Sequence, residues 1–69
     1  MENNRIRIGN RIRDIRQSQN LSQQDLADQA EITRANISRI EAGKYSPGLD
    51  VLSQIAEALN CEIDFKPKH

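Results

Sequence analysis

Two helical patterns joined by a short connection occupy positions 22–43, SQQDLADQAEITRANISRIEAG. The first pattern opens with Ser22, a residue typical of helix starts because its hydroxyl accepts a hydrogen bond from an early backbone N–H. Asp25 follows in the first turn, where a negative charge meets the positive end of the helix. These signals predict a helix over about 22–30.

The second pattern begins at Thr33, which is again a good capping residue. Ile37 and Ile40 mark the inner face of a helix that is predicted over about 34–42, and Gly43 ends it. Because only three residues connect the two helices, the helices must cross at a steep angle. The sequence therefore predicts a helix-turn-helix.

Helical patterns also flank this pair on both sides. A helix is predicted over about 5–18, because isoleucines recur there at helical spacing, and Asn20, which tolerates left-handed backbone, suits its end. A fourth helix is predicted over about 49–59, after a loop rich in Gly, Pro and Ser. The apolar residues that define these two helices are Ile8, Ile12 and Ile15 in the first, and Leu49, Leu52, Ile55, Ala56 and Leu59 in the last.

The C-terminal residues follow a different pattern. Cys61, Ile63 and Phe65 alternate with charged residues, which predicts a short β-strand. A lone strand is unstable in water, so it would pair with the same strand of a second copy; the alternative is a tail that packs Ile63 and Phe65 on its own helices. The expected architecture is an all-α domain of four helices over 1–60, followed by a short C-terminal β-strand in 61–69.

Composition limits the classes of function. A chain of 69 residues has room for one small domain. It contains no apolar stretch of the roughly 20 residues that cross a bilayer, so we expect a cytoplasmic protein without a membrane partner. With one cysteine, Cys61, and one histidine, His69, it offers no set of metal ligands and no Ser/His/acid or Cys/His catalytic set. We therefore expect no enzymatic activity, no metal, no cofactor and no small-molecule ligand.

Charge is distributed unevenly along the chain, although the formal net charge is zero. Residues 1–20 contain five arginines against two acidic side chains, whereas the remainder contains five basic and eight acidic side chains. A neutral protein of this kind can present a basic face, which is the electrostatic feature that nucleic-acid binding requires. The competing interpretation is an arginine-rich helix face that is only solvated.

Residues 21–60, LSQQDLADQAEITRANISRIEAGKYSPGLDVLSQIAEALN, resemble the Cro and lambda-repressor type of helix-turn-helix domain, also called the XRE family. Gln23 stands where the family's second helix begins, Ala27 stands at its small packing position, and IEAGK at 40–44 resembles the end of its third helix. One residue departs from the pattern. The turn usually carries Gly, and this chain has Glu31, which must adopt left-handed geometry at a cost of about 1 kcal/mol or more.

The resemblance implies that the helix over 34–42 enters the major groove of DNA, which admits one α-helix. Arginine suits guanine, because its paired donors match two acceptors on that base. The residues expected to contact bases are Thr33, Arg34, Ala35, Ser38 and Arg39, and those expected to contact phosphates are Ser22, Gln23, Asn36, Lys44, Arg11, Arg13 and Tyr45. By the same resemblance, Arg16 and Glu41 form a partly buried structural ion pair that fixes two helices against each other.

These expectations define a function, which is sequence-specific binding of double-stranded DNA by a transcriptional repressor at the nucleoid. One such domain contacts too few base pairs to select a site in a genome, so we expect a homodimer on a palindromic operator, with Cys61, Ile63 and Phe65 in the dimer interface. Two alternatives fit the same fold. One is the antitoxin of a toxin–antitoxin pair, which binds a toxin protein as well as DNA, and the other is a restriction–modification controller.

Overall fold

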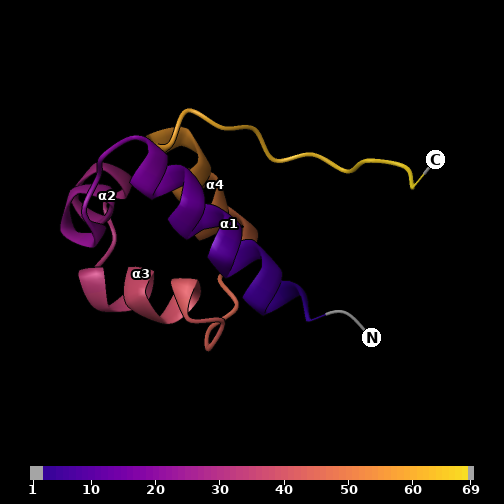
Figure 1. Cartoon of the computed structure of the whole chain (residues 1–69), viewed down its shortest axis with the longest axis horizontal. Coiled ribbons are helices and arrows are strands. Elements are labelled where there is room, and N and C mark those ends of the chain that lie inside the picture. The colour runs from indigo at the N-terminus through magenta and orange to yellow at the C-terminus, as the bar shows by residue number, and fades with distance from the viewer. Residues whose placement is uncertain (1–2, 69) are drawn as a thin grey trace.

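Four α-helices make up the computed structural model, which describes residues 3–68 (Figure 1). They are α1 (Asn4–Ser18), α2 (Gln23–Ala30), α3 (Arg34–Glu41) and α4 (Leu49–Ala58). The predicted all-helical class is confirmed, and the ends of each helix lie within one residue of the predicted limits. Within residues 3–68, no helix has the length and apolar character that would span a membrane.

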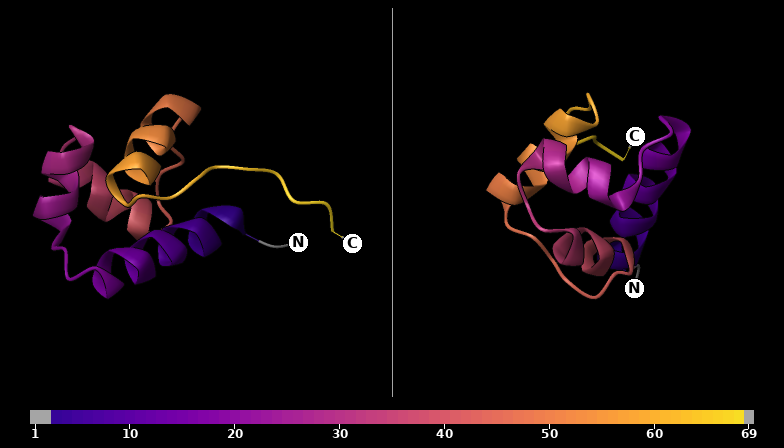
Figure 2. Two further views of the ribbon diagram at one scale, coloured as in Figure 1. Left: turned by 90° about the horizontal axis from the view of Figure 1, so that it is seen from above. Right: turned by 90° about the vertical axis from the view of Figure 1, so that its left-hand side faces the viewer.

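The four helices enclose one apolar core. α3 packs against α1 and α2, and α2 also packs against α4. Figure 2 shows α2 and α3 at one end of the molecule, with the N-terminal end of α1 and the C-terminal tail extending the other way. The buried apolar residues are Ile12, Leu26, Ala27, Ala30, Ile37, Ile40, Ile55 and Leu59. Because α3 contributes only one side to this core, its opposite side faces solvent.

A glycine allows α1 and α3 to approach closely. Gly9 is buried in the middle of α1, and a Cβ built there would overlap the carbonyl oxygen of Ile40 and lie 3.0 Å from that of Glu41. A helix interior normally disfavours Gly relative to Ala by about 1 kcal/mol, which makes an internal glycine a signal of close packing. Sequence reasoning passed over Gly9, although that signal was present.

The turn between α2 and α3 holds a non-glycine residue in left-handed backbone geometry, which costs free energy. Glu31 lies in the left-handed region, with φ 60° and ψ 41°, as the resemblance required of this non-glycine residue. The backbone N–H of Ile32 then donates to the carbonyl of Ala27 at 3.0 Å, which closes the end of α2. Asn20 has the same backbone geometry after α1, with φ 60°.

Substitution of Glu31 by Gly is expected to raise the free energy of unfolding by about 0.5–1 kcal/mol, because Gly adopts left-handed backbone without a steric penalty. Urea unfolding followed by circular dichroism measures this change. The matched control is Glu31→Ala, which removes the same carboxylate and keeps the strained backbone. Equal stability of the Gly and Ala variants would contradict a strained turn.

The predicted C-terminal strand is wrong for this chain. Residues 61–68 are extended, but within the described part of the chain they form no strand (Figure 1). A strand needs a hydrogen-bonded neighbour, and a bundle of helices offers no sheet edge. Packing of the tail on its own helices is also only partial, because Cys61 contacts the core, Ile63 is 43% exposed and Phe65 is 96% exposed. His69 lies outside the described residues.

Candidate nucleic-acid interface

α3 divides its residues between the core and the solvent. Ile37 and Ile40 are buried on its inner side. Since an α-helix has 3.6 residues per turn, positions between them point the other way. The five residues predicted to contact bases are all exposed: Thr33, Arg34, Ala35, Ser38 and Arg39. The structure thus places them on one exposed surface, which we call the outer face of α3.

The two arginines of the outer face are held differently. Nη2 of Arg39 donates a 2.6 Å hydrogen bond to Oδ1 of Asn36, three residues earlier. Arg34 has no hydrogen-bond or ion-pair partner among residues 3–68. The hydroxyl of Thr33 caps the helix by accepting from the backbone N–H of Asn36 at 3.2 Å. Asn36 is also a predicted phosphate contact; its side-chain oxygen accepts from Arg39, and its amide N–H groups remain available as donors.

The start of α2 is closed by a reciprocal pair of hydrogen bonds. The hydroxyl of Ser22 accepts from the backbone N–H of Asp25 at 2.9 Å, and Oδ2 of Asp25 accepts from the backbone N–H of Ser22 at 2.9 Å. The hydrogen bond from the Ser22 backbone N–H, and after it the Ser22 hydroxyl, holds the pKa of the Asp25 carboxyl below its ordinary value. The carboxylate therefore stays ionised as the cap partner, and the cap weakens only when the pH falls through that lowered pKa. Next to the cap, the first N–H groups of α2 provide a partial positive charge that suits a phosphate.

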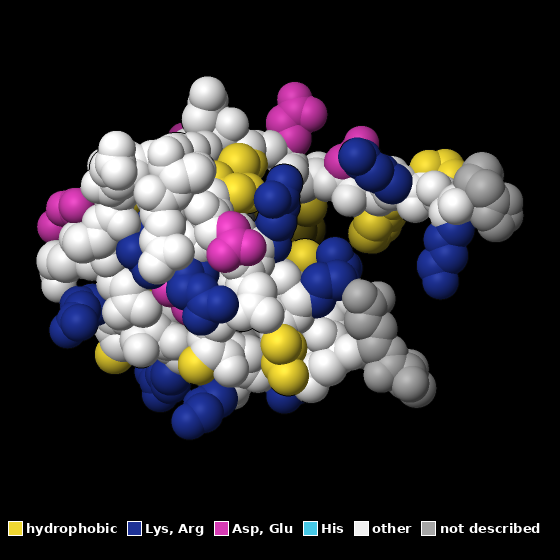
Figure 3. Space-filling view, in the orientation of Figure 1, with side chains coloured by type: hydrophobic (Ala, Val, Ile, Leu, Met, Phe, Trp, Pro, Cys, Tyr) yellow, Lys and Arg dark blue, Asp and Glu magenta, His cyan; other side chains and the backbone are white. Residues whose placement is uncertain are grey.

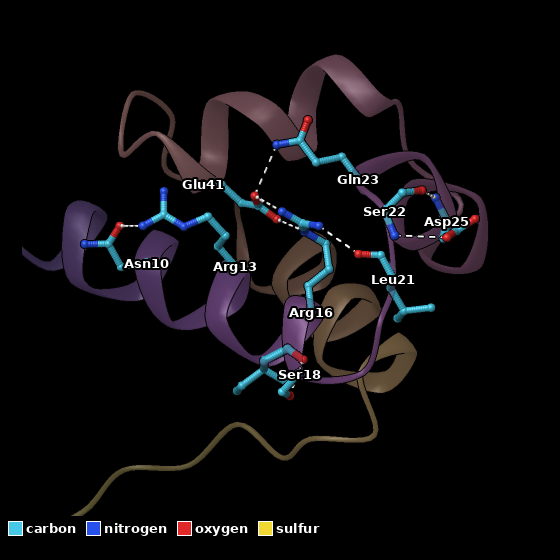
Figure 4. Close-up of polar contacts among 10 residues, drawn as sticks. Asn10, Arg13, Arg16, Ser18, Leu21, Ser22, Gln23, Asp25 and Glu41 are labelled. Carbon is cyan, nitrogen blue, oxygen red and sulfur yellow. Dashed lines mark hydrogen bonds and ion pairs between the residues drawn. The ribbon is translucent and has the colours of Figure 1, made fainter.

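A buried ion pair joins three segments of the domain (Figure 4). Arg16 of α1 is 8% exposed and Glu41 of α3 is 4% exposed. They form two hydrogen bonds, Nε to Oε2 at 2.7 Å and Nη2 to Oε1 at 3.0 Å, while Nη1 of Arg16 donates to the backbone carbonyl of Leu21 at 2.7 Å. The hydrogen bond with Glu41 raises the pKa of Arg16 above its ordinary value, against the opposing effect of burial. The geometry is that of the expected structural pair, and it ties the segment before α2 as well.

Gln23 belongs to the same cluster. Its Nε2 donates to Oε1 of Glu41 at 3.1 Å, so the first residue of α2 is linked to the last residue of α3. A side-chain amide has two N–H donors, which leaves one for a phosphate at the start of α2. The link between Gln23 and Glu41 was not anticipated from sequence, because a separation of 18 positions gives no local signal that these two side chains meet.

The structure separates two arginines of α1 that sequence reasoning had grouped. Arg13 is half-buried, donates to Oδ1 of Asn10 at 2.8 Å and lies on the same side of α1 as the Arg16–Glu41 pair (Figure 4). Arg11 instead lines a groove between α1, α4 and the tail, away from α3. Arg13 therefore remains a candidate phosphate contact on the side of α1 near Glu41, whereas Arg11 lies in the groove beside α4.

The loop after α3 carries the remaining predicted contacts. Gly43 has φ 75°, a left-handed geometry that ends α3. The backbone N–H of Lys44 then donates to the carbonyl of Arg39 at 3.0 Å, and the Lys44 side chain is exposed. Tyr45 is 41% exposed and lines a small hollow between this loop and the start of α1. Lys44 thus flanks the outer face, whereas the Tyr45 ring partly packs on its own protein.

Basic side chains dominate the side of the molecule that carries α3 and the near face of α1 (Figure 3). The uneven distribution of charge along the sequence therefore produces a basic face on a chain with zero formal net charge. Within residues 3–68, no group of three or more His, Cys, Asp or Glu is placed to hold a metal ion. The chemistry available at this surface is that of hydrogen-bond donors and positive charges, which suits a polyanion.

Comparison with known proteins gives consistent matches. A family model described as "Helix-turn-helix" matches residues 12–66. An uncharacterized HTH-type transcriptional regulator, y4dL of Sinorhizobium fredii, is 39% identical over 61 residues, which cover 88% of this chain and 31% of the relative. The immunity repressor protein of Bacillus phage phi105 is 36% identical over 56 residues, which cover 81% of this chain and 39% of the relative. The chain thus spans well under two thirds of these two relatives.

A solved structure matches over nearly its whole length. The restriction-modification controller protein C.AhdI from Aeromonas hydrophila is 29% identical to this chain and superposes with a TM-score of 0.84. The match covers 86% of this chain and 89% of that chain. A likeness of this extent means that the two molecules share the arrangement of the helices.

Proposed function

Because the chain belongs to the helix-turn-helix family of the XRE type, we propose that it binds double-stranded DNA in a sequence-specific manner and represses transcription. The observation that carries this proposal is the outer face of α3, where two arginines lie on an exposed helix whose other side is buried. A helix of this width fits the major groove, and a repressor acts by occupying an operator that polymerase needs. We propose no enzymatic activity and a location at the nucleoid in the cytoplasm.

In this proposal the residues have separate roles. Arg34 and Arg39 donate to guanine, Ala35 contacts a thymine methyl group, and Thr33 and Ser38 contact base edges. Phosphates bind at the start of α2, next to Ser22 and Gln23, and at the loop after α3, where Lys44 lies. Arg13 adds a positive charge on the α1 side. The phosphate contacts set the orientation of α3 on the duplex and carry no sequence information.

We further propose that two copies bind an imperfect palindrome as a homodimer. A single α3 spans few base pairs, so two half-sites about one helical turn apart give the required selectivity. The apolar side chains that remain exposed at α4 and the tail support an interface there, since Leu49 is 67% exposed, Ile63 is 43% exposed and Phe65 is 96% exposed. Cys61, at the root of the tail, would lie at the edge of that interface.

Selection from a random pool of duplex DNA tests the proposal directly. We expect a palindromic sequence that outcompetes scrambled DNA by about 10³-fold or more, with half-sites about one helical turn apart. Titration with salt then gives the number of phosphate contacts. Absence of any enriched sequence, with weak binding that salt abolishes, would refute sequence-specific binding.

Alanine substitutions separate base contacts from phosphate contacts. Arg34→Ala and Arg39→Ala are each expected to relax the preference at one base pair by about 1–3 kcal/mol, while Gln23→Ala weakens binding to all duplexes about equally. Fluorescence anisotropy with single-base variants of the selected duplex measures both effects. Arg11→Ala is the matched control, because Arg11 lies in the groove beside α4 and should leave binding unchanged. Uniform weakening by the two α3 variants would contradict direct base readout.

A second candidate function has a specific observation in its favour. The controller protein from Aeromonas hydrophila superposes on this chain with a TM-score of 0.84 at 29% identity. A restriction–modification controller is therefore the alternative that we keep. Mapping the selected sequence on the source genome distinguishes the two, since a controller would bind beside methyltransferase and endonuclease genes.

A further inference from the structure

We propose that Asn36 is a positioning residue for DNA readout, and that its side chain fixes the Arg39 guanidinium before DNA binds. The inference rests on the proposed function and deepens it, because it assigns the sharper base discrimination to Arg39 rather than to Arg34. It also gives Asn36 a role other than the phosphate contact expected from its position in the sequence.

The geometry of Asn36 makes it a suitable anchor. Asn36 is half-buried on the flank of α3, and its backbone N–H is bound by the hydroxyl of Thr33 at 3.2 Å. The backbone of Asn36 is therefore held in the first turn of the helix, and its side-chain Oδ1 accepts the 2.6 Å hydrogen bond from Nη2 of Arg39. A guanidinium has five N–H donors, so one bond to Asn36 leaves a pair of donors for guanine.

Fixing Arg39 in advance increases discrimination. A free arginine side chain loses rotational freedom when it binds, and it can also adjust to an incorrect base. Arg39 is restrained by Asn36, whereas Arg34 has no partner among residues 3–68. The restrained side chain presents its donors in one direction and tolerates fewer bases, while the free one adapts to a base or a phosphate.

The same hydrogen bond recurs elsewhere and provides a matched control. Asn10 accepts from Arg13 at 2.8 Å with the same spacing of three residues, on α1. Only the Asn36–Arg39 pair lies at the outer face of α3. Asn10→Ala thus removes an equivalent bond beside the proposed phosphate contact Arg13, and it should not alter the preference for any base.

The test is a double-mutant cycle on DNA binding with Asn36→Ala, Arg39→Ala and the double variant, and with Asn10→Ala as control. Circular dichroism first establishes that each variant is folded. Kd is then measured for the selected duplex and for its single-base variants. We expect Asn36→Ala to reduce the preference by about 3- to 10-fold at the same base pair that Arg39→Ala affects. The dependence of Kd on salt should stay unchanged, and Asn36→Ala should add nothing when Arg39 is already Ala.

Three results would overturn the inference. Uniform weakening on all duplexes with a smaller salt dependence would make Asn36 a phosphate contact. An equal loss from Asn36→Ala whether or not Arg39 is present would show that Asn36 acts on its own. If the unaltered protein preferred no duplex, the proposed function would fall together with this inference. In the first two outcomes the unaltered protein still prefers one duplex, so the proposed function stands and only the inference fails.

Discussion

Glu41→Ala is expected to lower the free energy of unfolding by about 3–5 kcal/mol, because it leaves the Arg16 guanidinium buried without its counter-charge. Arg16 is 8% exposed, and two of its three hydrogen-bonded nitrogens donate to Glu41. A domain of 69 residues has a total stability of about 3–10 kcal/mol, so this variant should be largely unfolded or close to it. Urea unfolding followed by circular dichroism gives the value.

A paired substitution separates charge burial from packing. Replacing both partners with apolar residues, Arg16→Met with Glu41→Leu, removes the uncompensated charge and should recover much of the stability lost in either single variant. If Glu41→Ala costs less than about 1 kcal/mol, as exposed ion pairs do, then the pair is not shielded from water in solution.

Gly9→Ala is expected to destabilise the domain by about 1–3 kcal/mol or more, although Ala is the better helix former. The added methyl group would overlap the carbonyl oxygen of Ile40, and backbone of α3 cannot move aside as a flexible side chain can. α1 must therefore shift away from the end of α3, which also disturbs the Arg16–Glu41 pair. Thermal and urea unfolding measure the loss.

Gln17→Ala is the control for this substitution, because Gln17 is exposed on the same helix and Ala at that site meets no neighbour across a helix interface. It should change stability by a few tenths of a kcal/mol. A Gly9→Ala protein as stable as the parent, or more stable, would mean that α1 and α3 do not approach as closely as the structure shows.

The helices could be predicted from the sequence because the signals that mark them are local. Ser22 and Thr33 mark helix starts through bonds to residues three positions away, and isoleucines at helical spacing mark the buried side. The left-handed geometry of Glu31 followed from the short connection together with the resemblance. The C-terminal strand failed for the converse reason. Alternation of apolar and charged residues is a local pattern, but a strand depends on a neighbour that this chain does not provide.

The candidate site was predictable to the same extent. Periodicity alone places Arg34, Ala35 and Arg39 on the side of α3 opposite the core. Periodicity does not predict which side chains contact one another across helices, or which neighbouring helix each side chain faces. The bond from Gln23 to Glu41 and the separation of Arg11 from Arg13 depend on how the helices pack, and no spacing in the chain encodes them.

The division of α3 between a buried and an exposed side has a consequence for how this domain can change its target. The residues that hold α3 in the fold, Ile37, Ile40 and Glu41, are different from those that point outward. Arg34, Ala35 and Ser38 take no part in the core, so their replacement costs little stability and alters the recognised sequence. Thr33 and Asn36 are less free, since one caps the helix and the other holds Arg39. Retargeting by design or by evolution would thus proceed first through three positions, on an unchanged scaffold.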